Sequence, residues 1–67
     1  MKRWKSTVGH EVENEKIDAF LTEVIEVCKK HGLSIGHEDS HGGFLVHKFS
    51  KDNADWLMNA DDETDSA

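Results

Sequence analysis

The fold is decided by residues 15–49, which read EKIDAFLTEVIEVCKKHGLSIGHEDSHGGFLVHKF. The first half of this stretch repeats apolar residues at the three-and-four spacing of one helical face, namely at Ile17, Phe20, Leu21, Val24, Val27 and Cys28. Asn14 is suited to cap the amino end, and Gly32 is suited to the left-handed position after the last turn. The pattern therefore predicts an amphipathic helix over residues 15–31.

The second half alternates with a period of two, which is typical of strands. Over residues 33–38, Leu33, Ile35 and His37 point one way and the residues between them point the other. Residues 44–49 read as a second strand, with Phe44 and Val46 on one face and Leu45, His47 and Phe49 on the other. Between the two segments lies a short loop of turn-forming residues, 39–43. Two strands joined by so short a loop are expected to pair as an antiparallel hairpin.

The flanks of this unit are less regular. Ser50 is a good N-cap for a short helix over residues 51–60, and residues 1–13 are either a flexible arm or a short strand. Residues 63–67 form an acidic tail that we expect to be disordered. The prediction is one small α+β domain over residues 1–62, with the order α-β-β-α, in which the hairpin packs on the long helix and a short helix follows. The expected core contains Phe20, Leu21, Val24, Ile35 and at least one of Phe44 and Val46.

Composition limits the classes of function. The 67 residues carry a formal net charge of -6 and a single cysteine, Cys28. The negative charge argues against direct binding of nucleic acid or an anionic membrane. No apolar run approaches the length of a membrane span, and no signal-peptide core follows the basic start, so we expect a cytoplasmic protein. A chain this small buries little surface and cannot form an internal disulfide, which predicts a homodimer or higher assembly.

The loop between the predicted strands carries the most unusual chemistry. It gathers nitrogen and oxygen donors among glycines, at His37, Glu38, Asp39, Ser40, His41, Gly42 and Gly43. We expect ligand contacts here, although the spacing matches no standard zinc pattern and predicts no metal or other cofactor. Neighbouring residues rarely meet in the geometry of a catalytic triad, so the chain is not expected to be an enzyme. Trp56 is either a core residue or an exposed anchor for a partner.

Residues 27–44, VCKKHGLSIGHEDSHGGF, resemble a family of small proteins from tailed bacteriophages and prophages. The similarity continues weakly through Ser50, Asn53, Trp56 and Leu57. This resemblance implies an accessory phage protein made inside a bacterium, and such proteins often disable a host factor or a defence component, or sequester a defence signal. It transfers no catalytic role.

Two functions follow as expectations. The first is a non-enzymatic binding protein that occupies a host or defence protein or a small signalling ligand. The alternative is a small metal- or nucleotide-binding protein that uses the hairpin region from His37 to His47.

Overall fold

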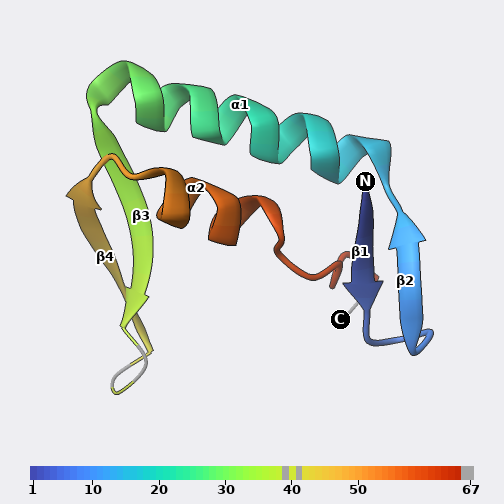
Figure 1. Cartoon of the computed structure of the whole chain (residues 1–67). Helices are drawn as coiled ribbons and strands as arrows, with labels where there is room; N and C mark the ends of the chain where they lie inside the picture. The colour runs from blue at the N-terminus through green and yellow to red at the C-terminus, as the bar shows by residue number, and fades with distance from the viewer. Residues whose placement is uncertain (39, 41, 66–67) are drawn as a thin grey trace.

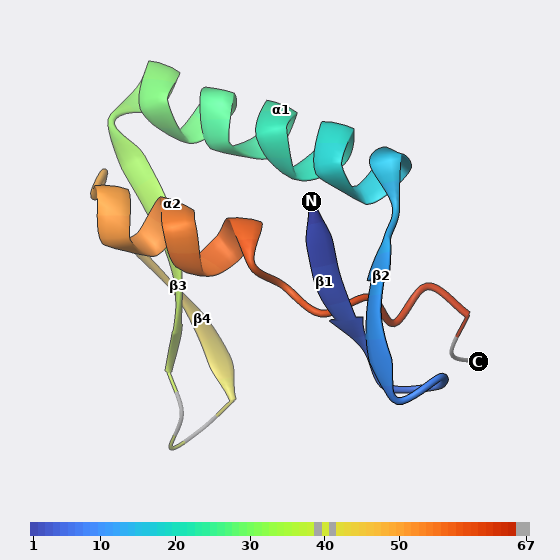
Figure 2. The same cartoon turned by 45° about the vertical axis from the view of Figure 1, so that its right-hand side comes forward.

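The protein is described here from a computed structural model, which places residues 1–38, 40 and 42–65. The chain forms strands β1 (Lys2–Lys5) and β2 (His10–Glu13), helix α1 (Glu15–His31), strands β3 (Leu33–Glu38) and β4 (Gly43–Lys48), and helix α2 (Lys51–Met58). The strands make two separate antiparallel hairpins, β1-β2 and β3-β4. These hairpins lie at opposite ends of α1, and α2 runs beside α1 (Figures 1 and 2). The mixed α+β class is confirmed.

Helix α1 begins and ends where its capping residues predict. The side chain of Asn14 accepts hydrogen bonds from the backbone N–H of Lys16 and of Ile17, at 3.1 and 3.3 Å. Gly32 closes the other end with φ 68° and ψ 26°, a left-handed conformation that costs other residues energy. Acidic residues in the first turn and basic residues in the last turn complement the helix dipole.

Strands β3 and β4 pair in a register that runs from Leu33 opposite Lys48 to Glu38 opposite Gly43. The hairpin is tied to α2 by Ser34, which is buried and accepts a hydrogen bond from the backbone N–H of Ser50 at 2.9 Å. The side chain of Ser50 in turn accepts from the N–H of Asn53 and caps α2. One buried hydroxyl therefore fixes the point where α2 leaves the sheet.

The amino-terminal segment contains more than the one short strand that the sequence suggested. Residues 2–13 form the hairpin β1-β2, in which strand β1 pairs with a second strand that was not predicted. Gly9 makes the turn possible with φ 72°. This pairing is difficult to predict because the four-residue strands have charged residues at most positions and show little alternation of apolar side chains.

The segment after α2 returns to the first hairpin. The N–H of Asp62 donates to the carbonyl of Trp4 at 2.8 Å. Within the segment predicted to be disordered, Glu63 accepts a hydrogen bond from the Ser6 hydroxyl and Asp65 accepts from Thr7. The remaining tail residues, 66 and 67, lie outside the described part of the chain. The assignment of residues 1–62 to a single domain and the expected disorder of the tail stay predictions.

The core is smaller than the apolar pattern of α1 predicts. Among the described hydrophobic residues only Leu21 is buried, at 5% exposure. The expected burial of Phe20, Phe44 and Val46 is wrong, because these side chains are 61, 76 and 72% exposed. The expected core members Val24 and Ile35 are half-buried. The reason is geometric: the elements that meet α1 are α2 and β3, and they cover only part of its apolar surface.

Neither helix in the described part of the chain has both the length and the apolar composition needed to cross a bilayer.

Candidate functional site

The predicted ligand-binding loop is held by contacts of its own. Both the N–H and the hydroxyl of Ser40 donate to Oε1 of Glu38, at 2.9 and 2.6 Å. Gly42 adopts φ 68° and its N–H donates to the carbonyl of Glu38 at 2.9 Å. Glu38, Ser40 and Gly42 therefore shape the turn, so the presence of these three residues is explained by folding. Asp39 and His41, which the same prediction includes, lie outside the described residues.

The histidines of the hairpin lie on opposite faces. His37 pairs with Phe44, and the two rings meet edge to face with centroids 5.8 Å apart. His47 pairs with Ser34, and its ring lies over Gly36 so closely that a Cβ at that glycine would be 2.7 Å from Nε2. Because strand residues alternate between faces, one ion could not reach both imidazoles. Within the described residues, no group of three His, Cys, Asp or Glu side chains is arranged to hold a metal.

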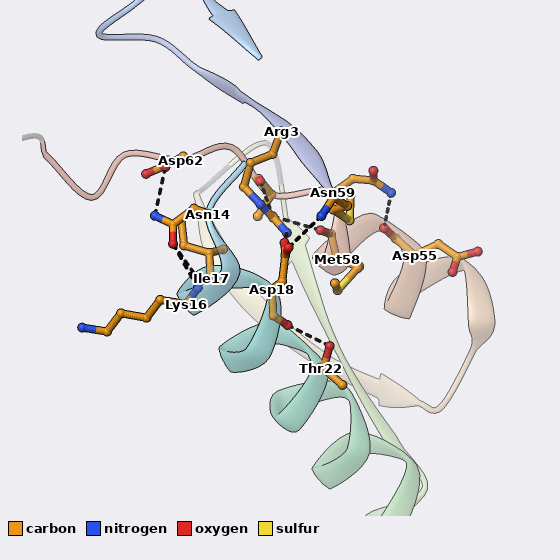
Figure 3. A network of polar contacts seen from close by, with 12 residues as sticks. Arg3, Asn14, Lys16, Ile17, Asp18, Thr22, Asp55, Met58, Asn59 and Asp62 are labelled. Atoms are coloured by element: carbon orange, nitrogen blue, oxygen red, sulfur yellow. Dashed lines mark hydrogen bonds and ion pairs between the residues drawn. The ribbon is translucent and has the colours of Figure 1, made fainter. Parts of the chain in front are cut away.

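A polar network joins the two ends of the chain (Figure 3). The Arg3 side chain is fully buried and donates to Asp18 at 2.6 Å and to the carbonyls of Met58 and Ala60 at 3.0 and 2.8 Å. Its Nε is buried without a hydrogen-bond partner in the described structure. The N-terminal ammonium also contacts Asp18, and this hydrogen bond, followed by that from Arg3, lowers the pKa of Asp18. These contacts attach β1 to α1 and α2, so the network is structural.

Asp62 is the second centre of this network. It is 1% exposed, and its carboxylate accepts hydrogen bonds from the hydroxyl and the N–H of Thr64 at 2.7 and 3.0 Å. Asn14 donates to the other oxygen at 3.3 Å, and Lys5 lies 3.4 Å away. These contacts, the Thr64 hydroxyl first, lower the pKa of Asp62 far below its ordinary value of 3.8. The negative form of Asp62 therefore stabilises the fold.

This carboxylate makes stability depend on pH. Because its pKa is lower in the folded than in the unfolded protein, its contribution is complete above about pH 4 and is lost as the pH falls further. Replacing Thr64 by valine removes the largest cause of the lowered pKa, so acid unfolding should begin at a higher pH. Thermal unfolding measured from neutral to acidic pH checks this. Thr22→Val is the control, since Thr22 donates to a backbone carbonyl; equal pH profiles of the two variants would contradict the assignment.

Exposed apolar side chains form the most extensive candidate contact surface. At 100° per residue, the apolar arc of α1 spans about 160° of its circumference, from Val27 at one border to Ile25 at the other. Leu21 lies on the covered part of this arc. Phe20, Val24 and Val27 lie on the other part, which we call the α1 flank. Phe20 and Val27 are 61 and 56% exposed, and Val24 is half-buried. The sequence analysis placed Phe20 and Val24 in the core and Val27 on the apolar face of the helix. The width of this apolar arc was the signal that the rest of so small a chain cannot cover all of it.

Two shallow hollows adjoin the α1 flank. One, of about 370 Å³, is lined by Phe20 and its neighbours Asn14, Lys16, Ile17 and Thr64. The other, of about 200 Å³, has only apolar lining surface and lies where α1 meets the outer side of the hairpin, at Val27, Cys28, His31, Leu33, Ile35 and Val46. The flank and the hairpin thus form one apolar surface rather than scattered exposed residues.

Trp56 is half-exposed, at 53%, on α2. It borders a third hollow with Leu57, Asn59, Ala60 and Asp61. The structure therefore leaves Trp56 accessible to a partner, as one of the two sequence interpretations expects, but does not bring it to the His37 loop or to the α1 flank.

These features are the only basis for assigning a site, since comparison with protein-family models, curated proteins and solved structures found no match to the chain.

Proposed function

We propose that the protein is a non-enzymatic binding protein that contacts a host or defence protein through the α1 flank. The observation that carries this proposal is the exposure of Phe20 and Val27 on a helix whose adjacent face, at Leu21, already packs against the rest of the chain. Clustered exposed apolar side chains on a soluble domain mark interaction surfaces more often than chance. Aromatic side chains at the centre of such a patch commonly contribute much of the binding energy.

The charge of the chain supports a protein partner with a basic rim. A formal charge of -6 on 67 residues attracts positively charged surfaces and raises the rate of encounter with them. Glu23, Glu26 and Lys30 border the α1 flank beside Val27. The apolar centre would then provide affinity, while the net negative charge of the chain would select the partner.

The resemblance to small phage proteins provides the setting of this proposal. An accessory protein made in a bacterial cytoplasm acts by occupying a factor of the host, which requires a contact surface and no reaction. The described residues are consistent with that mode, because the strongest polar network, around Arg3, links the parts of the fold to one another.

Variant-dependent capture from bacterial lysate tests the proposal. We expect Phe20→Ala to lose the captured protein by at least about tenfold, the effect of losing about 1.4 kcal/mol at a binding hot spot. His37→Ala and Trp56→Ala are matched single substitutions of exposed rings elsewhere, and they should retain capture. Thermal unfolding of each variant confirms that it is folded.

The other outcomes distinguish the remaining functions. Loss of capture only with His37→Ala would move the site to the hairpin loop. A metal or nucleotide that copurifies with the untagged protein, together with full protein capture by Phe20→Ala, would favour the alternative of a small-ligand-binding protein and reject the α1 flank.

A further inference from the structure

The outer edge of β4 is an unpaired strand edge. Among the elements of the described chain, β4 contacts only β3, and in Figure 1 its outer side faces away from the rest of the fold. All six of its residues are exposed. Such an edge presents a row of backbone N–H and C=O groups that can pair with another strand.

The direction of these backbone groups follows from one hydrogen bond. The N–H of Phe49 donates to the carbonyl of Gly32 at 2.8 Å, which makes these two residues a hydrogen-bonded pair. Hydrogen-bonded and non-bonded pairs alternate along an antiparallel ladder. In the observed register, the backbone groups of residues 43, 45 and 47 therefore point toward β3. Those of Phe44, Val46 and Lys48 point away from the molecule.

Two of these three residues carry the most exposed large apolar side chains of the described chain. Phe44 is 76% and Val46 is 72% exposed, more than any other large hydrophobic residue of the described chain. With Leu33 and Ile35 of β3, they lie on one side of the hairpin, which we call the hairpin face. The edge and the hairpin face thus combine open hydrogen-bonding groups with uncovered apolar surface.

The extent of uncovered surface matches one side of a dimer interface. The chain exposes 5071 Å² for a mass of 7.6 kDa, whereas a compact monomer of this mass exposes about 4300 Å². The excess of roughly 800 Å² equals the area that each partner contributes to a standard interface. The radius of gyration, 12.9 Å, also exceeds the value of about 11 Å expected for a compact chain of this length.

We propose that two copies of the chain pair antiparallel through their β4 edges and form one continuous four-stranded sheet. With Val46 on the two-fold axis, Val46 lies opposite Val46 of the second copy, and Phe44 lies opposite Lys48 of the second copy. The two hairpin faces then join on one side of the sheet, with both Ile35-Val46 pairs in its central row. This assembly does not rest on the proposed function, because it pairs the β4 edges whereas Phe20 of the α1 flank lies on another element. The two surfaces adjoin at the hollow that Val27 shares with Leu33, Ile35 and Val46.

A second copy fits this edge better than an unrelated chain for a reason of charge. Although the whole chain is strongly acidic, β4 contains no acidic residue, and Lys48 is its only charged side chain of fixed sign. In the proposed register the two Lys48 residues are separated by four positions along the strand, about 13 Å. Self-pairing therefore places no like charges opposite one another. Such facing charges are the usual obstacle to association of identical edges.

Sedimentation of the untagged full chain, with amide exchange as a second measurement, tests the proposal. We expect a mass of twice 7.6 kDa at high micromolar concentration. The amides of Phe44, Val46 and Lys48 should be protected, and this protection should disappear on dilution. Val46→Asp should give a monomer, because it places two carboxylates on the axis. Val8→Asp is the matched control: Val8 is 48% exposed at the turn of the other hairpin, and this variant should stay dimeric.

A second variant keeps the test valid if Val46→Asp fails to fold. Val46→Pro removes the outward N–H while leaving the hydrogen bonds to β3 intact, since proline is tolerated on a strand edge in this orientation. It should fold and sediment as a monomer. A monomeric wild-type protein at high micromolar concentration would overturn the proposal. A dimer in which the amides of Phe44, Val46 and Lys48 exchange freely would also overturn the proposal. The same holds if the Val46→Pro variant remains a dimer. The capture experiment distinguishes this proposal from the proposed function. If Val46→Pro still captures the partner protein and Phe20→Ala does not, partner binding through the α1 flank holds whether or not the chain dimerises through β4.

Discussion

Replacing Arg3 by methionine is expected to unfold the protein at room temperature. The Arg3 side chain is fully buried and satisfies the Asp18 carboxylate and two backbone carbonyls, those of Met58 and Ala60. Methionine has similar length but no donor, so all three acceptors would lose this hydrogen bond. Removing one partner of such a pair costs about 3–5 kcal/mol, which is close to the whole stability of a domain this small. Urea denaturation followed by circular dichroism measures the effect.

Lys2→Met is the matched control for this experiment. Lys2 precedes Arg3 on the same strand, is exposed, and loses the same charge in this substitution, so it should change the free energy of unfolding by less than about 0.5 kcal/mol. Arg3→Lys should give an intermediate loss, because an ammonium cannot reproduce the planar fork that reaches several acceptors. All variants must be compared at one protein concentration if the chain self-associates. A denaturation midpoint of Arg3→Met equal to that of Lys2→Met would show that the network does not stabilise the fold.

The second large effect is expected at Leu21. This is the one hydrophobic side chain of the described residues that is buried, at 5% exposure, on the covered face of α1. Leu21→Ala should destabilise the protein by about 2–5 kcal/mol through lost apolar contact and the cavity that remains. Because the described residues include no other buried hydrophobic side chain that could compensate, most of the protein should be unfolded. A thermal unfolding transition shifted strongly downward, or absent, is the expected observation.

The neighbouring residue provides the comparison. Phe20 is larger than Leu21 and follows the same helical pattern, yet it is 61% exposed. Phe20→Ala should therefore cost less than about 1 kcal/mol, since surface substitutions rarely cost more. The difference between the stability losses of Phe20→Ala and Leu21→Ala tests the burial pattern directly, because the sequence analysis placed both residues in the core whereas the structure buries only Leu21. Equal destabilisation by the two substitutions would mean that Phe20 is covered in solution, for example by a partner or by another copy of the chain.

Local signals predicted the main elements of this protein well. The start and end of α1 are governed by Asn14 and Gly32, whose capping contacts involve only neighbours in the sequence. Strand β3 occupies the predicted residues, and β4 begins and ends one residue earlier than predicted. Helix α2 ends at Met58, two residues short of the prediction, and Ser50 caps it as expected. Each of these features depends on backbone geometry within a few residues.

The candidate site was less predictable because exposure is not a local property. The periodic pattern of α1 identifies which side chains are apolar, but the number that are covered depends on how much of the helix α2 and β3 reach. Phe20 and Leu21 are adjacent in the sequence and differ in exposure by more than tenfold. Similarly, the composition of the His37 loop indicated ligand donors, whereas the hydrogen bonds of Ser40 to Glu38 show a structural role.

Composition and contacts between near neighbours were enough to predict the α+β class, the acidic charge, both ends of α1 and the start of α2. The hairpin of residues 2–13 depends instead on tertiary contacts, because Arg3 holds it through Asp18, Met58 and Ala60, up to 57 positions away. The tertiary structure also decided which apolar side chains stay uncovered. Both outcomes depend on contacts between distant parts of the chain, whose side chains must be placed in space before their partners are known.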